Sequence, residues 1–161
     1  MKNYFIIHGT FGHNKENWFG WLEDELLKMG CEVFNFNYPT PEGHNFENWS
    51  NVLNKVKNKI TDKSVFVCHS SAPIFLIKYC LTNNIEIGKL ISVSGANNFK
   101  VGVPEFDDIN KLMFVDDVSN FKNDYIPTVK ALEINKSRII EKVNLKPDWY
   151  RWTKRNKPDW I

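Results

Sequence analysis

Short apolar stretches alternate along the chain with longer stretches in which apolar residues recur at helical spacing. The short stretches are rich in β-branched and aromatic residues and predict strands at residues 4–7, 31–36, 64–68 and 90–93. The longer stretches have an apolar face and predict helices at residues 18–28, 49–60 and 74–81. Strands and helices therefore alternate over the first 95 residues.

Nearly continuous apolar strands that alternate with helices are typical of a parallel sheet covered on both faces and joined by right-handed crossovers. We therefore predict an α/β fold, a three-layer α/β/α sandwich with a mainly parallel sheet. The pattern weakens after Gly95, because residues 106–118 are acidic and mixed. From Asn120 onward, Asn, Lys and isolated apolar residues dominate the sequence.

The length, charge and cysteine content of the chain indicate which kinds of protein it can be. The 161 residues suit one globular domain, and no run of about 18 apolar residues predicts a membrane span. The net charge of +2 does not indicate a nucleic-acid partner, although residues 136–161 carry 8 Lys and Arg against 3 acidic residues. Three widely spaced cysteines without a Cys-x-x-Cys pair indicate free buried thiols in a reducing compartment. We expect a cytoplasmic protein without metal or cofactor.

One candidate nucleophile follows the third predicted strand. The stretch Cys68-His69-Ser70-Ser71-Ala72 leads from an apolar strand into an apolar helix, which is the layout of a nucleophile elbow with Ser70 at its tip. Such a turn requires small residues two positions before and after the serine, where this chain has Cys68 and Ala72. The alternative interpretation is that Ser70 and Ser71 merely cap the helix.

A second motif follows the first predicted strand. In a parallel sheet the loops at the carboxyl ends of neighbouring strands converge, so His8-Gly9-Thr10-Phe11-Gly12 should lie beside Ser70. The backbone N–H of Thr10 or Phe11, together with that of Ser71, could form the two-donor oxyanion hole that acyl transfer needs. The alternative for His8-Gly9 is an ordinary turn at the end of a strand.

These residues, with others in the same order and spacing, resemble the small α/β-hydrolases of the YdeN and retinoblastoma-binding protein 9 type. The motifs that carry the resemblance are His8-Gly9-Thr10, Asn17-Trp18-Phe19, Tyr38-Pro39-Thr40-Pro41, Trp49, Cys68-His69-Ser70-Ser71-Ala72 and Ser92-Val93-Ser94-Gly95-Ala96. The resemblance covers about residues 2 to 122. It implies an α/β-hydrolase-like domain over residues 1–122, followed by a divergent basic, Trp-rich segment at residues 123–161.

The resemblance also implies a triad of Ser70 with a later Asp and a later His, carried by two further strands. Neither turn is found in this sequence, whose last histidine is His69. The expected sheet therefore lacks the family's last two strands and ends on the strand at residues 90–93. His8 and His44 are candidates for a replacement base, whereas His69 should point away from Ser70 and pack near its strand.

Two functions follow from this pattern. The first is a serine hydrolase that cleaves small ester, amide or thioester substrates through a Ser70 acyl-enzyme, with activity impaired by the missing base. The alternative is a catalytically inactive binding protein with the hydrolase fold, or a truncated product. In either case the expected partner is a small molecule, with no nucleic acid and no membrane, and the oligomeric state is not predicted.

Overall fold

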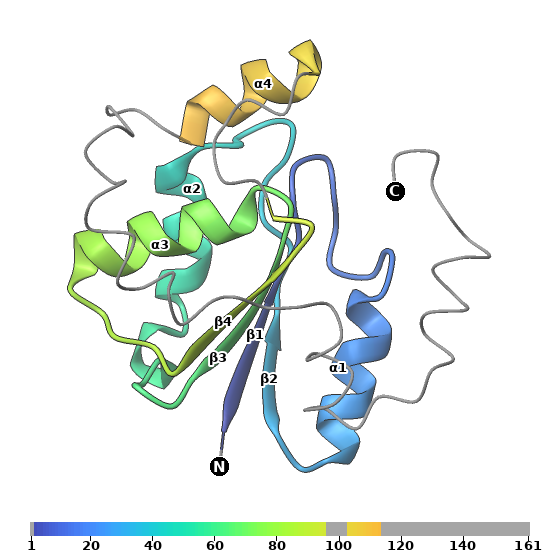
Figure 1. The fold of residues 1–161 in the computed structure, drawn as a ribbon, viewed down its shortest axis with the longest axis vertical. Coiled ribbons are helices and arrows are strands. Elements are labelled where there is room, and N and C mark those ends of the chain that lie inside the picture. Colours follow the sequence, from blue (N-terminus) through green and yellow to red (C-terminus); the bar gives the residue numbers. More distant parts are fainter. Residues whose placement is uncertain (1, 96–102, 114–161) are drawn as a thin grey trace.

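The computed structural model describes residues 2–95 and 103–113, whose arrangement is drawn in Figure 1. Four parallel strands form one sheet in the order β2-β1-β3-β4. They are β1 (Asn3–Ile7), β2 (Glu32–Asn35), β3 (Val65–His69) and β4 (Lys89–Val93). Each of the four strands predicted from the apolar pattern is present, and the prediction of a parallel sheet is confirmed.

Helices cover both faces of this sheet. Helix α1 (Phe19–Lys28) lies on one face, and α2 (Phe46–Asn54) and α3 (Ala72–Asn83) lie on the other (Figure 1). The apolar core is correspondingly divided into two clusters, one under α1 and one under α2 and α3. The predicted three-layer α/β/α sandwich is therefore confirmed.

The second helix differs from its predicted range of 49–60. It begins earlier, because the Asn45 side chain accepts a hydrogen bond from the Asn48 N–H at 2.8 Å and caps the helix. It ends at Asn54, and a short 3₁₀ turn at Lys57–Lys59 takes up part of the remaining stretch. The apolar spacing continues through both segments, so the pattern alone does not reveal the break.

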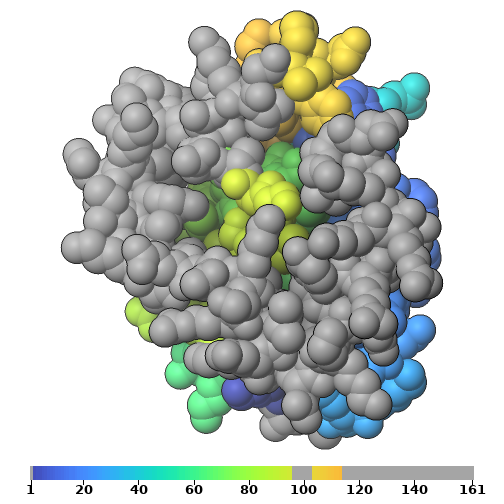
Figure 2. Space-filling view, turned by 45° about the vertical axis from the view of Figure 1, so that its right-hand side comes forward, coloured from blue at the N-terminus to red at the C-terminus, as the bar shows by residue number. Residues whose placement is uncertain are grey.

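A further helix, α4 (Pro104–Asn110), lies where the hydrophobic pattern predicted none, and a 3₁₀ turn at Lys111–Met113 follows it. Its sequence does carry helix-start signals, since Pro104 occupies the first turn together with the acidic residues Glu105 and Asp107. Figures 1 and 2 both place α4 (gold) at the upper end of the molecule, where the strands of the sheet end.

Strand β4 is the last strand of the sheet among residues 2–95 and 103–113. The predicted divergent segment at 123–161 lies outside the described residues. Within the described part of the chain no helix is long and apolar enough to span a membrane. The same part contains no cluster of three His, Cys, Asp or Glu side chains that could hold a metal ion.

Candidate active site

The turn between β3 and α3 holds Ser70 in a strained conformation. Ser70 has a φ of 54°, in the left-handed region that costs a residue with a side chain about 1–2 kcal/mol. Its N–H donates to the Val93 carbonyl oxygen at 3.3 Å, which joins the turn to β4. Cys68 and Ala72 on either side are both fully buried, so only small residues fit at these positions.

Helix capping does not account for the two serines. Ser71 occupies the N-cap position of α3, but its side chain makes no capping hydrogen bond. Its hydroxyl oxygen instead lies 2.8 Å from the hydroxyl oxygen of Thr10, in the loop after β1. The two hydroxyls therefore join the turn after β3 to the loop after β1.

The loop after β1 packs directly on the Ser70 turn. Ile7 pairs with Cys68 in the parallel register, so the next residues of β1 and β3 leave the sheet side by side. A Cβ atom added to Gly9 would lie 2.5 Å from the Ser70 Cβ and 3.2 Å from the Ser70 Oγ. Only glycine allows this approach, and the expected convergence of the two motifs is confirmed.

The two candidate oxyanion donors in this loop, Thr10 and Phe11, differ in their hydrogen bonds. The Phe11 N–H donates to the Thr40 hydroxyl at 2.9 Å, and the Phe11 ring lies against Phe106 of α4 with the ring centroids 5.0 Å apart. By contrast, no described residue accepts a hydrogen bond from the backbone N–H of Thr10 or of Ser71. Of the two predicted donors, Thr10 is therefore the one whose N–H makes no hydrogen bond within the described residues.

Asn110, at the end of α4, is a site residue that the sequence analysis missed. Its Oδ1 accepts a hydrogen bond from the Thr10 hydroxyl at 2.6 Å, and its side chain is buried. The two residues are 100 positions apart in the sequence. No local pattern could have revealed this pair, because it exists only once α4 lies over the loop.

His8 is held by the backbone through both ring nitrogens. Its Nε2 accepts a hydrogen bond from the Tyr38 N–H at 2.9 Å. Nδ1, which lies 2.8 Å from the Gly9 carbonyl oxygen, must therefore carry the proton and donate it there. Burial lowers the pKa of His8, so the ring stays neutral. With both nitrogens engaged, His8 is poorly suited to be the replacement base considered from the sequence.

His69 lies on the α1 face of the sheet. Its ring contacts those of Trp18 and Phe19, with centroids 6.2 and 5.7 Å away, and burial lowers its pKa to about 4. The expectation that His69 packs near its strand is confirmed by these contacts.

His44 lies on the opposite face and is 1% exposed, with its ring centroid 4.9 Å from that of Trp49. Neither ring nitrogen makes a hydrogen bond of good geometry within the described residues. Burial lowers the pKa of His44 to about 4, and the nearby Asn110 side chain offsets this only in part. Of the two candidate bases from the sequence, His44 is thus the one with ring nitrogens available.

The lowered pKa values of His44 and His69 predict acid sensitivity. Between about pH 6.5 and 4 the unfolded chain binds protons on these two rings that the folded chain does not. The free energy of unfolding should therefore fall as the pH drops, by roughly 2 to 3 kcal/mol for each histidine. Urea unfolding at a series of pH values measures this dependence.

Two variants locate the source of the acid sensitivity. His69→Gln should reduce the pH dependence of the free energy of unfolding, because the proton uptake of one of the two buried rings is removed. His13→Gln is the matched control, since the His13 side chain is 59% exposed. A free energy of unfolding that stays constant from pH 7 to pH 4.5 in the unmodified chain would contradict the expectation.

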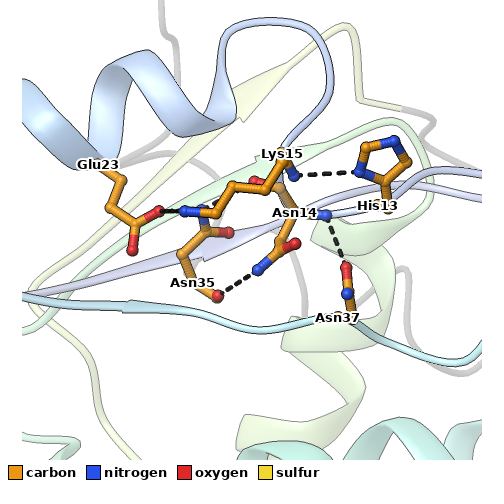
Figure 3. A network of polar contacts seen from close by, with 6 residues as sticks. All are labelled: His13, Asn14, Lys15, Glu23, Asn35 and Asn37. Atoms are coloured by element: carbon orange, nitrogen blue, oxygen red, sulfur yellow. Dashed lines mark hydrogen bonds and ion pairs between the residues drawn. The ribbon is translucent and has the colours of Figure 1, made fainter.

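A polar network fastens the loop before α1 to strand β2 (Figure 3). The Asn14 side chain donates to the Asn35 carbonyl oxygen at 2.8 Å, and the Asn35 side chain donates back to the Asn14 carbonyl oxygen at 2.9 Å. Glu23 accepts from both Asn35 and Lys15, and the Asn14 N–H donates to Asn37. The end of this loop opposite Gly9 is thereby held against the sheet.

The matches to known proteins cover the part of the chain that forms the sheet and carries Ser70. A family model described as serine hydrolase matches residues 4–126. The chain is 28% identical to YdeN of Bacillus subtilis (strain 168) over 96 residues, which are 58% of this chain and 50% of YdeN. It thus spans about half the length of that relative.

Two solved structures are similar in fold. The crystal structure of the Bacillus subtilis ydeN gene product matches with a TM-score of 0.59 and 23% identity, covering 72% of this chain and 62% of that one. A monoacylglycerol lipase of Paleococcus ferrophilus matches with a TM-score of 0.50 and 20% identity, covering 65% and 42%. Both matches support the α/β-hydrolase-like fold.

Proposed function

Because this chain belongs to the serine hydrolase family, we propose that it cleaves small ester, amide or thioester substrates through an acyl-enzyme on Ser70. One observation carries the proposal: Gly9 packs against a strained Ser70, and the N–H groups of the next residues, Thr10 and Ser71, make no hydrogen bond within the described residues. Strain at a residue with a side chain is typical of functional sites, where the surrounding structure maintains it.

In the proposed reaction the Ser70 Oγ attacks the carbonyl carbon of the substrate and loses its proton to a base. The carbonyl oxygen becomes an oxyanion, which accepts hydrogen bonds from the Thr10 and Ser71 N–H groups. The carbonyl reforms as the leaving group departs with a proton, and an acyl group remains on Ser70. Water then attacks this ester, which releases the carboxylic acid and restores the Ser70 hydroxyl.

The proposed reaction needs a base that takes the proton of the Ser70 hydroxyl. No described side chain accepts a hydrogen bond from the Ser70 hydroxyl. His44 is our candidate for the base, because its ring is neutral near pH 7 and its nitrogens make no hydrogen bond of good geometry within the described residues. A second function, a non-catalytic binding protein for small molecules, is favoured by the same lack of a contact at Ser70, since an unactivated serine hydroxyl is a weak nucleophile.

Labelling with a fluorophosphonate, which reacts with activated serines, tests the proposal. The native chain is incubated with the probe at pH 7.5, and intact mass and peptide mapping then give the stoichiometry and the position of the label. We expect one label per chain, located on Ser70, and none in a heat-denatured sample. Circular dichroism of the native sample confirms that it is folded.

The two candidate functions predict different results. Labelling at Ser70 supports the hydrolase, and its loss in a His44→Gln variant that remains folded would identify His44 as the base. A folded native chain that takes up no label would overturn the hydrolase proposal and leave the binding protein as the function to pursue.

A further inference from the structure

Three buried polar side chains from three separate elements form a continuous hydrogen-bonded chain beside Ser70. Ser71 precedes α3, Thr10 follows β1 and Asn110 ends α4, and their exposed fractions are 2%, 8% and 2%. The Ser71 and Thr10 hydroxyl oxygens are 2.8 Å apart, and the Thr10 hydroxyl donates to Asn110 Oδ1 at 2.6 Å.

The directions of these hydrogen bonds follow from the number of protons. The Thr10 hydroxyl has one proton, which it donates to Asn110. The Ser71 hydroxyl must then donate to Thr10 Oγ1. The chain therefore runs in one direction, from Ser71 through Thr10 to Asn110, and ends on an amide oxygen that cannot donate. Removing the Asn110 acceptor would leave a buried hydroxyl without its partner.

Two of these residues are also the backbone donors of the proposed oxyanion hole. The side chains of Thr10 and Ser71 are joined to each other, so separating the loop after β1 from the turn after β3 would break a buried hydrogen bond. A second contact holds α4 on the same loop, because the Phe106 ring lies edge-on to the Phe11 ring at 5.0 Å. Helix α4 thus contacts the loop at both Thr10 and Phe11.

We propose that Asn110 and the Thr10 and Ser71 hydroxyls are positioning residues that set the spacing of the two oxyanion donors, with α4 as their anchor. This inference rests on the proposed function. Preorganised donors stabilise an oxyanion because no reorganisation is needed as the charge develops. Without the side-chain hydrogen bonds, the loop that carries the Thr10 N–H could move relative to the turn that carries the Ser71 N–H.

Fluorophosphonate labelling kinetics test the role, since the phosphoryl oxygen of the probe takes the position of the oxyanion. Thr10→Val removes the hydroxyl at constant shape, and Asn110→Ala removes its acceptor. In each variant we expect the maximal labelling rate kinact to fall by about tenfold to a hundredfold, with the half-saturating probe concentration KI within about twofold. Thr10→Ser, which retains the hydroxyl, should stay within about threefold of the unmodified chain.

Thr61→Val is the matched control, because Thr61 is exposed in the turn before β3, at the other end of the sheet. Circular dichroism and urea unfolding show which variants are folded at the labelling temperature. A Thr10→Val variant that is folded and labels Ser70 as fast as the unmodified chain would overturn the inference and leave the hydrolase proposal intact. An unmodified chain that is folded and does not label would overturn both.

Discussion

Ser70→Ala is expected to abolish fluorophosphonate labelling completely while the chain remains folded. The substitution removes the side-chain oxygen that attacks the substrate, and the probe, in the proposed mechanism. It leaves the Ser70 N–H bond to the Val93 carbonyl oxygen, because that bond uses the backbone. Intact mass after incubation with excess probe measures the loss.

Backbone strain at the same position predicts different stabilities for two substitutions. Ala at position 70 keeps a side chain at a φ of 54°, whereas Gly adopts this conformation without steric cost. Ser70→Gly should therefore be more stable than Ser70→Ala by about 1 kcal/mol, although both lose labelling. Urea unfolding of the two variants gives this difference.

Ser50→Ala is the matched control for the Ser70 variants. The Ser50 hydroxyl is buried on α2 and has no hydrogen-bond partner within the described residues, so its removal should leave labelling unchanged. Stoichiometric labelling that persists in Ser70→Ala would show that another residue reacts with the probe. That result would remove the central residue from the proposed mechanism.

Gly9→Ala is expected to slow labelling of Ser70 by about a hundredfold and to destabilise the fold by about 1–3 kcal/mol. The new Cβ would lie 2.5 Å from the Ser70 Cβ and 3.1 Å from the His69 carbonyl oxygen. Neither atom is the end of a flexible side chain, so the loop and the turn must separate. That separation moves the Thr10 N–H away from Ser70.

Gly20→Ala separates this effect from the general consequence of replacing a glycine. Gly20 lies in the first turn of α1, where an added Cβ would have no neighbour closer than 3.7 Å, so alanine fits without strain. We expect unchanged labelling and a stability equal to or slightly above that of the unmodified chain. Labelling of a folded Gly9→Ala variant at the unmodified rate would contradict the close packing of the loop on Ser70.

The strand and helix pattern predicted most of the architecture, because burial of an apolar strand or helix face leaves a local periodic signal. Strand β3 illustrates this, since the run Val65–Cys68 is buried along its whole length. The proximity of Gly9 to Ser70 was predictable too, because parallel strands bring their carboxyl ends to one edge of the sheet. The positions of the two motifs needed no information beyond topology.

The hydrogen bonds of individual groups at the site were not predictable in this way. From the sequence, Thr10 and Phe11 were equivalent as oxyanion donors. The structure distinguishes them, because the Phe11 N–H donates to the Thr40 hydroxyl. The sequence also left His8 and His44 equivalent as bases, whereas the Tyr38 N–H engages His8. Each of these partners comes from the loop after β2, whose path over the site has no periodic pattern.

The sequence by itself determined the α/β class, the four parallel strands and the small-residue turn at Ser70, because these depend on local periodicity and on the size of neighbouring residues. The tertiary structure alone decided that α4 lies at the strand ends, that Asn110 holds Thr10 across 100 positions, and that His44 is buried against Trp49. The physical reason is that hydrogen bonds and burial depend on distances in space. Such distances between remote residues leave no trace in their spacing along the chain.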